Sequence, residues 1–452
     1  MERSNSLDAL RGIAILAMVL SGSIAFGNAL PAWMFHAQVP PPYHAFNPEL
    51  PGITWVDLVF PFFLFSMGAA LPLALHKRVA QGPFYKTFGY ILQRYLLLVF
   101  FALFTVHARA KNINADPGVA TYLLSIGCFV LLFFMYVKWE GRWGLIIKLL
   151  AYALAVLFLA LTPKGFDINK SDIIIIVLAN MAFFGSLIWW GTRNNPWLRI
   201  GILPFIMAVF LAGKTEGTWN HELFTWSPLP WMYTFYYLKY LFIIIPGTFA
   251  GEWLMQRPRE QVKDDKTAWM TVACISLLLV LVNLAGLFSR LLLINLFITL
   301  LLCTILLGLM GRMRTENSCF KKYLQAGVYL LLLGLAFEGY EAGIKKDPST
   351  YSYYFVTAGL AFLTLLAFSI SEYFGYLGKI IYFFALNGRN PMVAYTAGNL
   401  VLIPILHITG IMPLFDSLQH NAFEGVLRGV LFTGIVSLIT IFCVKRKWYW
   451  KT

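Results

Sequence analysis

Charged residues are scarce in this chain of 452 residues, at 12% of the total, and no long polar stretch interrupts it. A large soluble protein needs a more highly charged surface than this composition can supply. Apolar runs of about twenty residues recur instead, which is the length that a membrane-spanning helix requires. The five cysteines have neither metal-ligand nor disulfide spacing, so we expect no metal site and no disulfide framework.

The recurring apolar runs predict an all-α fold, a polytopic transmembrane helix bundle of about 11–14 spans. We expect a single integral-membrane domain over residues 1–452. Residues 376–386 have the character of an interfacial or re-entrant helix. The segments with the hydropathy of spans are 8–29, 54–75, 87–107, 118–137, 144–162, 172–191, 197–213, 234–255, 268–287, 289–311, 322–343, 351–371, 391–412 and 424–444.

The formal net charge is +14, which raises the question of a nucleic-acid partner. The basic residues lie mostly in alternate short loops, with a ratio of about three to one between the two sides, as cytoplasmic loops do. This placement argues against nucleic acid and puts both termini in the cytoplasm. We also expect the first span to remain as an anchor, because no clear cleavage site follows it.

A histidine and an aspartate flank the end of the Pro-rich outer loop over residues 31–52. Asp57 stands at the mouth of the second span, where an ionisable group requires a partner or a function. His44 lies thirteen residues earlier, and His36 in the same loop is its rival. A carboxylate that orients an imidazole makes the ring a better base. The structural alternative is an interfacial histidine with an aspartate that suits a helix N-terminus.

Polar groups at the expected cytoplasmic side predict an anion site. Asp8 and Arg11 are three residues apart at the start of the first span, so they can form a pair on one helix face. Arg94 is about two turns into its span. Arg11 and Arg94 could hold nucleotide phosphates. Alternatively, Asp8 and Arg11 form a topogenic helix start, and Arg94 extends to the membrane surface.

Asn390 precedes Pro391 before a late apolar run. One interpretation is an N-cap residue followed by proline at the first helical position. The other is a polar floor to an intramembrane cavity, in which Asn390 helps to hold the ligand. The sequence leaves both interpretations open.

Several of these segments resemble the heparan-alpha-glucosaminide N-acetyltransferase family of transmembrane acyltransferases, in its bacterial branch. Residues 6–18 resemble the family pattern SLDxxRGxxxxxM, and residues 44–68 resemble HAxWxGxTxxDLVFPFFLFxxG, with three extra residues after the histidine. Shorter matches occur at 247–253, at 346–361 and in the GxNxxxxY pattern that contains Asn390.

The resemblance implies transfer of an acetyl group from cytoplasmic acetyl-CoA to a periplasmic sugar or glycan amine or hydroxyl. It implies His44 as the catalytic residue and Asp57 as its partner. The expected partners are acetyl-CoA, the glycan acceptor and the lipid bilayer, with a homodimer as an option, and the expected location is the bacterial inner membrane. The alternatives are a secondary transporter of a small solute and a catalytically degenerate scaffold.

Overall fold

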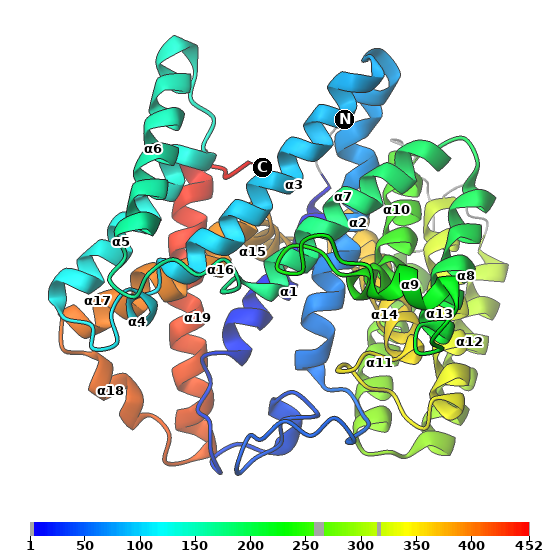
Figure 1. The fold of residues 1–452 in the computed structure, drawn as a ribbon. Coiled ribbons are helices and arrows are strands. Elements are labelled where there is room, and N and C mark those ends of the chain that lie inside the picture. Colours follow the sequence, from blue (N-terminus) through cyan, green and yellow to red (C-terminus); the bar gives the residue numbers. More distant parts are fainter. Residues whose placement is uncertain (1–3, 257–265, 314–317, 452) are drawn as a thin grey trace. The chain divides into compact units, whose positions relative to one another are not determined.

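The computed structural model describes residues 4–256, 266–313 and 318–451, and Figure 1 shows their fold. Within these ranges the chain forms helices and loops, and the only β pairing is one isolated bridge between Val137 and Trp450. The all-α prediction is therefore confirmed.

Ten helices in the described part of the chain are long and apolar enough to cross a membrane, which confirms the multi-pass character. Each corresponds to one expected span. They are α2 (Trp55–Gln81), α3 (Phe84–His107), α5 (Val119–Tyr136), α6 (Gly141–Leu161), α7 (Ile173–Thr192), α11 (Lys266–Phe288), α12 (Leu292–Arg312), α14 (Tyr351–Phe374), the broken helix Pro391–Ile408 and α19 (Ala422–Lys445).

The other four expected spans are also helices, but they fall short of the length or the hydropathy of this set. Three are short, and the fourth carries lysines at its start and a glutamate near its end. The first span ends at residue 21 and not at 29, because the small residues 21–23 terminate it. The four are α1 (Asn5–Ser21), α8 (Pro196–Ala212), α10 (Leu241–Met255) and α13 (Ser318–Tyr340).

The chain divides into two compact units, each assembled from three separate stretches of sequence. The first unit comprises residues 1–73, 242–389 and 419–429. The second comprises residues 74–241, 390–418 and 430–452. The expectation of one domain over residues 1–452 stays a prediction.

The first unit is built around α14, whose residues are almost all buried. Helices α13 and α11 pack against it, and α1 packs against both α14 and α15 (Gly378–Gly388). Glu372 near the end of α14 accepts hydrogen bonds from the backbone N–H groups of Asn5 and Ser6, at 2.8 and 3.1 Å. A carboxylate from α14 thus satisfies the free donors at the start of α1.

Two glycines let α1 and α15 approach each other closely. A Cβ atom on Gly12 would overlap the carbonyl oxygen of Phe384, and one on Gly388 would overlap that of Asp8. Small residues at such crossings are a common means of packing helices in membranes, where no hydrophobic effect drives association. The same device brings α2 against α10 at Gly68 and Gly251.

The second unit pairs α3 with α7 and α5 with α6. Its span over residues 391–408 is broken by a π-helical segment, in which the N–H of Ile403 bonds to the carbonyl of Gly398. Pro404 follows and has no N–H to donate. The short elements of this unit are α4 (Ala110–Ile113), α9 (Trp219–Thr225), η2 (Phe235–Tyr240), α16 (Pro391–Ala397), η3 (Gly398–Leu402), α17 (Ile403–Ile408) and α18 (Met412–Ser417), and η1 (Ala32–Met34) lies in the first unit.

We predict that Gly12→Ala destabilises the protein by about 1–3 kcal/mol, because the added methyl group forces α1 away from α15. Gly89→Ala on α3 is the control, since a Cβ there meets open space. The measurement is thermal unfolding of the two purified variants in detergent. Equal melting temperatures for the two variants would contradict the close packing.

Candidate functional site

Asp57 lies in the first turn of α2, and its side chain is fully buried. Its Oδ2 atom accepts hydrogen bonds from the N–H of Thr54 at 2.9 Å, the N–H of Ala37 at 3.2 Å and the hydroxyl of Thr54 at 3.3 Å. These donors and the positive end of the helix dipole stabilise a carboxylate in this position. The Oδ1 atom has no hydrogen-bond partner in the described structure.

The free oxygen of Asp57 faces two nitrogen-bearing side chains. Nδ1 of His36 lies 3.5 Å from Oδ1, and Nζ of Lys346 lies 3.7 Å from the same atom. The other ring nitrogen of His36, Nε2, lies 3.6 Å from Oδ2 of Asp347. His36 therefore stands between two carboxylates. The predicted pairing of Asp57 with His44 is wrong, and the rival histidine takes that place.

His44 is occupied by its own loop. Its Nε2 accepts a hydrogen bond from the N–H of Gly27 at 2.8 Å, and its Nδ1 lies 3.3 Å from the carbonyl oxygen of Val39. The ring packs against Phe26 and Phe35, with centroid distances of 5.1 and 4.5 Å. Both nitrogens thus serve to hold the outer loop together.

The Pro-rich turn explains why His36, and not His44, faces Asp57. Residues 40–43 form a turn that leads His44 into the left-handed region, with φ of 49°, and directs its ring toward the start of the loop. A His-Ala dipeptide occurs twice in this loop, at 36–37 and at 44–45. In the first copy, the histidine faces Asp57 and the alanine N–H binds it. The repeated dipeptide makes His36 and His44 equal candidates in the sequence.

Gln38 connects this loop to the loop between α13 and α14. The side chain is fully buried, and its Nε2 donates to the carbonyls of Asp347 at 2.6 Å and Pro48 at 3.2 Å. Its Oε1 accepts from the N–H of Asp347 at 2.9 Å, and its backbone N–H donates to Nδ1 of His36 at 3.0 Å. One residue therefore positions both His36 and Asp347, and the sequence analysis missed it.

The outer edge of the site is open to solvent. The Asp347 side chain is 49% exposed, whereas those of Lys346 and His36 are 22% and 17% exposed. The facing imidazole of His36 lowers the pKa of Asp347, with a further contribution from the Lys346 ammonium, and partial burial opposes them. Asp347 is therefore ionised at neutral pH, beside a histidine that a ligand can approach.

A second polar cluster lies between α1, α2 and α15. Arg11 Nη1 is 3.5 Å from Oδ1 of Asp8, which confirms the predicted pair, and 3.5 Å from the carbonyl oxygen of Gly388. Its Nη2 donates to the carbonyl of Ser66 at 3.2 Å. Arg389, which the sequence analysis missed, brings its Nε to 3.7 Å from Oδ2 of Asp8. Two guanidinium groups thus share one carboxylate.

The two clusters occupy different levels of the first unit. Ser66, which Arg11 contacts, follows Asp57 by nine residues on α2, and a helix rises about 14 Å over that length. A ligand that contacts both Arg11 and His36 therefore has to be elongated.

The family model that matches this chain names no activity. The family described as a domain of unknown function, DUF5009, matches residues 3–254, which is more than half of the chain. This chain belongs to the DUF5009 family. Comparison with curated proteins finds no match. The matched range contains both His36 and Asp57 and ends before Lys346.

Arg94 of this DUF5009 protein belongs to the second unit. It lies on α3, and its Nε atom is buried without a hydrogen-bond partner among the described residues. A buried guanidinium with a free N–H is chemically suited to bind an anion. Because Arg11 belongs to the first unit, a shared phosphate site of these two arginines stays a prediction.

Asn390 uses its amide within the second unit of the DUF5009 protein. Its Nδ2 donates to the carbonyl of Trp448 at 2.8 Å, and its Oδ1 accepts from the N–H of Trp450 at 3.2 Å. Asn390 occupies the N-cap position with Pro391 at the start of α16, but its side chain makes no capping hydrogen bond. The amide thus holds the C-terminal segment, and its predicted contribution to ligand binding is untested.

Tyr395 completes a further polar cluster in the second unit. Its hydroxyl lies 2.9 and 2.8 Å from the two carboxylate oxygens of Asp172, and Arg109 Nη2 lies 2.9 Å from Oδ2 of the same residue. Asp172 also caps α7 through the N–H of Ile175. This carboxylate is saturated, which favours a structural role.

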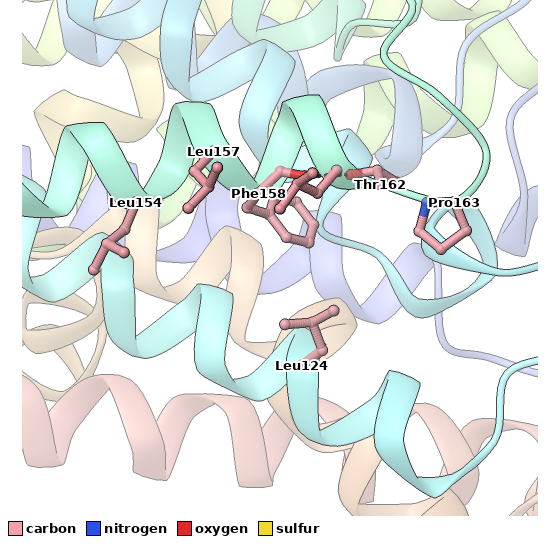
Figure 2. A pocket seen from close by; sticks show the side chains of 7 residues that line it. Leu124, Leu154, Leu157, Phe158, Thr162 and Pro163 are labelled. Atoms are coloured by element: carbon pink, nitrogen blue, oxygen red, sulfur yellow. Dashed lines mark hydrogen bonds between the residues drawn. The ribbon is translucent and has the colours of Figure 1, made fainter.

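A pocket of about 300 Å³ lies in the second unit against α5 and α6. Figure 2 shows leucine side chains from both helices and a phenylalanine directed into it. The lining is almost wholly apolar and includes none of the candidate site residues, so the pocket suits an apolar chain and offers no acid or base. Its lining residues are Leu124, Leu154, Leu157, Phe158, Leu161, Thr162 and Pro163.

We predict that Gln38→Ala lowers the stability of the protein by about 1–3 kcal/mol, because the buried N–H and carbonyl of Asp347 lose their partner. Gln93→Ala, at an exposed position of α3, is the matched control. Thermal unfolding in detergent measures both variants. An unchanged melting temperature for Gln38→Ala would show that the two outer loops do not depend on this side chain.

Proposed function

We propose that this protein is a membrane-embedded acyltransferase. It moves an acetyl group from cytoplasmic acetyl-CoA to an amine or hydroxyl of a sugar or glycan on the far side of the membrane. The observation that carries the proposal is His36, held between the buried Asp57 and the exposed Asp347. The resemblance of residues 6–18 and 44–68 to transmembrane acetyltransferases supports the same chemistry. A bacterial inner membrane is the proposed location.

His36 acts as the general base in this proposal. In the structure Nδ1 accepts the N–H of Gln38 at 3.0 Å, so the base form requires that bond to break. The ring proton then lies on Nδ1, directed at Oδ1 of Asp57, and Nε2 keeps its lone pair for the acceptor. The acceptor loses its proton to Nε2 as its nitrogen or oxygen attacks the thioester carbon. The tetrahedral intermediate then expels the thiolate of CoA, which takes the proton from His36. Transfer through an acetyl-histidine is the alternative route.

Arg11 and Arg389 form the proposed donor site. Both guanidinium groups contact Asp8, and a pair of guanidinium groups at one place suits the phosphates of acetyl-CoA.

The decisive comparison is between the two histidines of the outer loop. We expect His36→Ala to lower acetyl transfer by about 10²–10⁴-fold, as removal of a general base does. We expect His44→Ala to lose thermal stability and to keep most of its turnover, because its ring contacts only the loop. The measurement is transfer of radiolabel from acetyl-CoA to glucosamine, glucose and membrane glycans by purified protein in vesicles. Full transfer by His36→Ala, or loss confined to His44→Ala, would refute this assignment.

Acetyl-CoA binding tests the donor site separately from the chemistry. We expect Arg11→Ala to weaken the binding of labelled acetyl-CoA by about tenfold or more, because a charge-assisted contact is lost. Lys379→Ala, at an exposed position of α15, is the control for loss of one positive charge. Equal binding by the two variants would remove Arg11 from the donor site. Absence of binding by folded wild-type protein would favour the scaffold or the transporter.

A secondary transporter is the second candidate function. The π-helical break within residues 391–408 and the unpartnered Nε of Arg94 support it, because transporters build substrate sites from broken helices and intramembrane charges. Uptake of a labelled solute into vesicles without acyl donor, and its loss in Arg94→Gln, would favour this function over acyl transfer.

A further inference from the structure

We infer that Lys346 is a catalytic residue of the proposed acyl transfer, and that its ammonium stabilises the oxyanion of the tetrahedral intermediate. The inference rests on the proposed function, in which His36 is the base. It assigns a role to a residue outside the range that the family model matches.

The position of Lys346 places a positive charge at the reaction centre. Its Nζ and the Nδ1 of His36 lie within 4 Å of the same oxygen of Asp57, so the ammonium and the proposed base are neighbours. The next residue, Asp347, faces the other nitrogen of His36. The backbone at this point is fixed by the two hydrogen bonds between Asp347 and the buried amide of Gln38. Lys346 is thereby anchored beside the imidazole.

The donors of Lys346 are also available for a ligand. The ion pair with Asp57 has a length of 3.7 Å, which is longer than a hydrogen bond, and the side chain is 22% exposed. Lys345 provides the contrast, because its Nζ donates to Oε2 of Glu49 at 3.2 Å. Of the two adjacent lysines, Lys346 is the one that can turn its N–H groups toward a substrate oxygen.

The chemical step shows what the ammonium does. When the acceptor atom attacks the thioester carbon, the π electrons of the carbonyl move to its oxygen, which becomes an oxyanion. An N–H of Lys346 donates to that oxygen while His36 holds the proton taken from the acceptor. The carbonyl then re-forms, the carbon–sulfur bond breaks, and the thiolate takes the proton from His36. No redox partner or further reactant is needed.

The test compares Lys346→Gln, Lys346→Arg and the neighbouring control Lys345→Gln in the acetyl-transfer assay. We expect Lys346→Gln to lower kcat by about 10²–10³-fold with an unchanged KM for acetyl-CoA, as loss of an oxyanion donor does. Lys346→Arg should recover most of the rate, because it keeps a cationic donor. Lys345→Gln should keep the rate of the wild type.

Two results would overturn the inference while leaving the acyltransferase in place. One is a Lys346→Gln protein with the kcat of the wild type. The other is recovery of kcat in the double variant Lys346→Gln with Asp57→Asn, which would show that Lys346 only neutralises Asp57. An inactive wild type that still binds acetyl-CoA would instead refute the proposed function, and the role of Lys346 with it.

Discussion

The burial of the Asp57 carboxylate is the constraint on which the outer end of the first unit depends. A buried carboxylate costs several kcal/mol unless donors and cations surround it. Here the donors come from the outer loop before α2, and the cation comes from the loop between α13 and α14. Tyr353 on α14 adds a hydrogen bond of 2.8 Å to the carbonyl of Asp57. The two loops therefore have to assemble around α2 together, which brings a histidine and a lysine to one carboxylate.

Much of the fold was accessible from hydropathy, because the apolar length of a span is a local property of the sequence. Ten predicted spans coincide with long apolar helices, and the polar entrance of α2 at Asp57 was visible as a charge at the edge of an apolar run. The choice between His36 and His44 was not accessible, because both precede an alanine in the same loop. Two features determine which histidine faces Asp57. One is the turn at residues 40–43, and the other is the hydrogen bond between Gln38 and Asp347, which are 309 positions apart.

In the Arg11 cluster, too, the contact within one helix was predictable from the sequence and the contact between helices was not. The pair of Asp8 and Arg11 follows from a spacing of three residues on one helix. Arg389 reaches Asp8 because glycines allow α1 and α15 to pack closely. The spacing of Asp8 and Arg11 does not predict this contact. Pairs within one helix are thus predictable from the sequence, whereas the second guanidinium of the cluster comes from a helix far away in the sequence.

The charges around His36 suit the role of base that we propose for it. With a neutral ring, Asp57, Asp347 and Lys346 together carry one net negative charge. In the proposed reaction, the proton that His36 takes from the acceptor makes the four side chains neutral as a group. The oxyanion of the proposed reaction is a new negative charge, which the flexible ammonium of Lys346 would follow while the two carboxylates hold the imidazolium. Lys346 and Asp347 are adjacent in the chain and carry opposite charges. In the proposed reaction, the cation at 346 is the partner of the oxyanion, and the anion at 347 is the partner of the imidazolium.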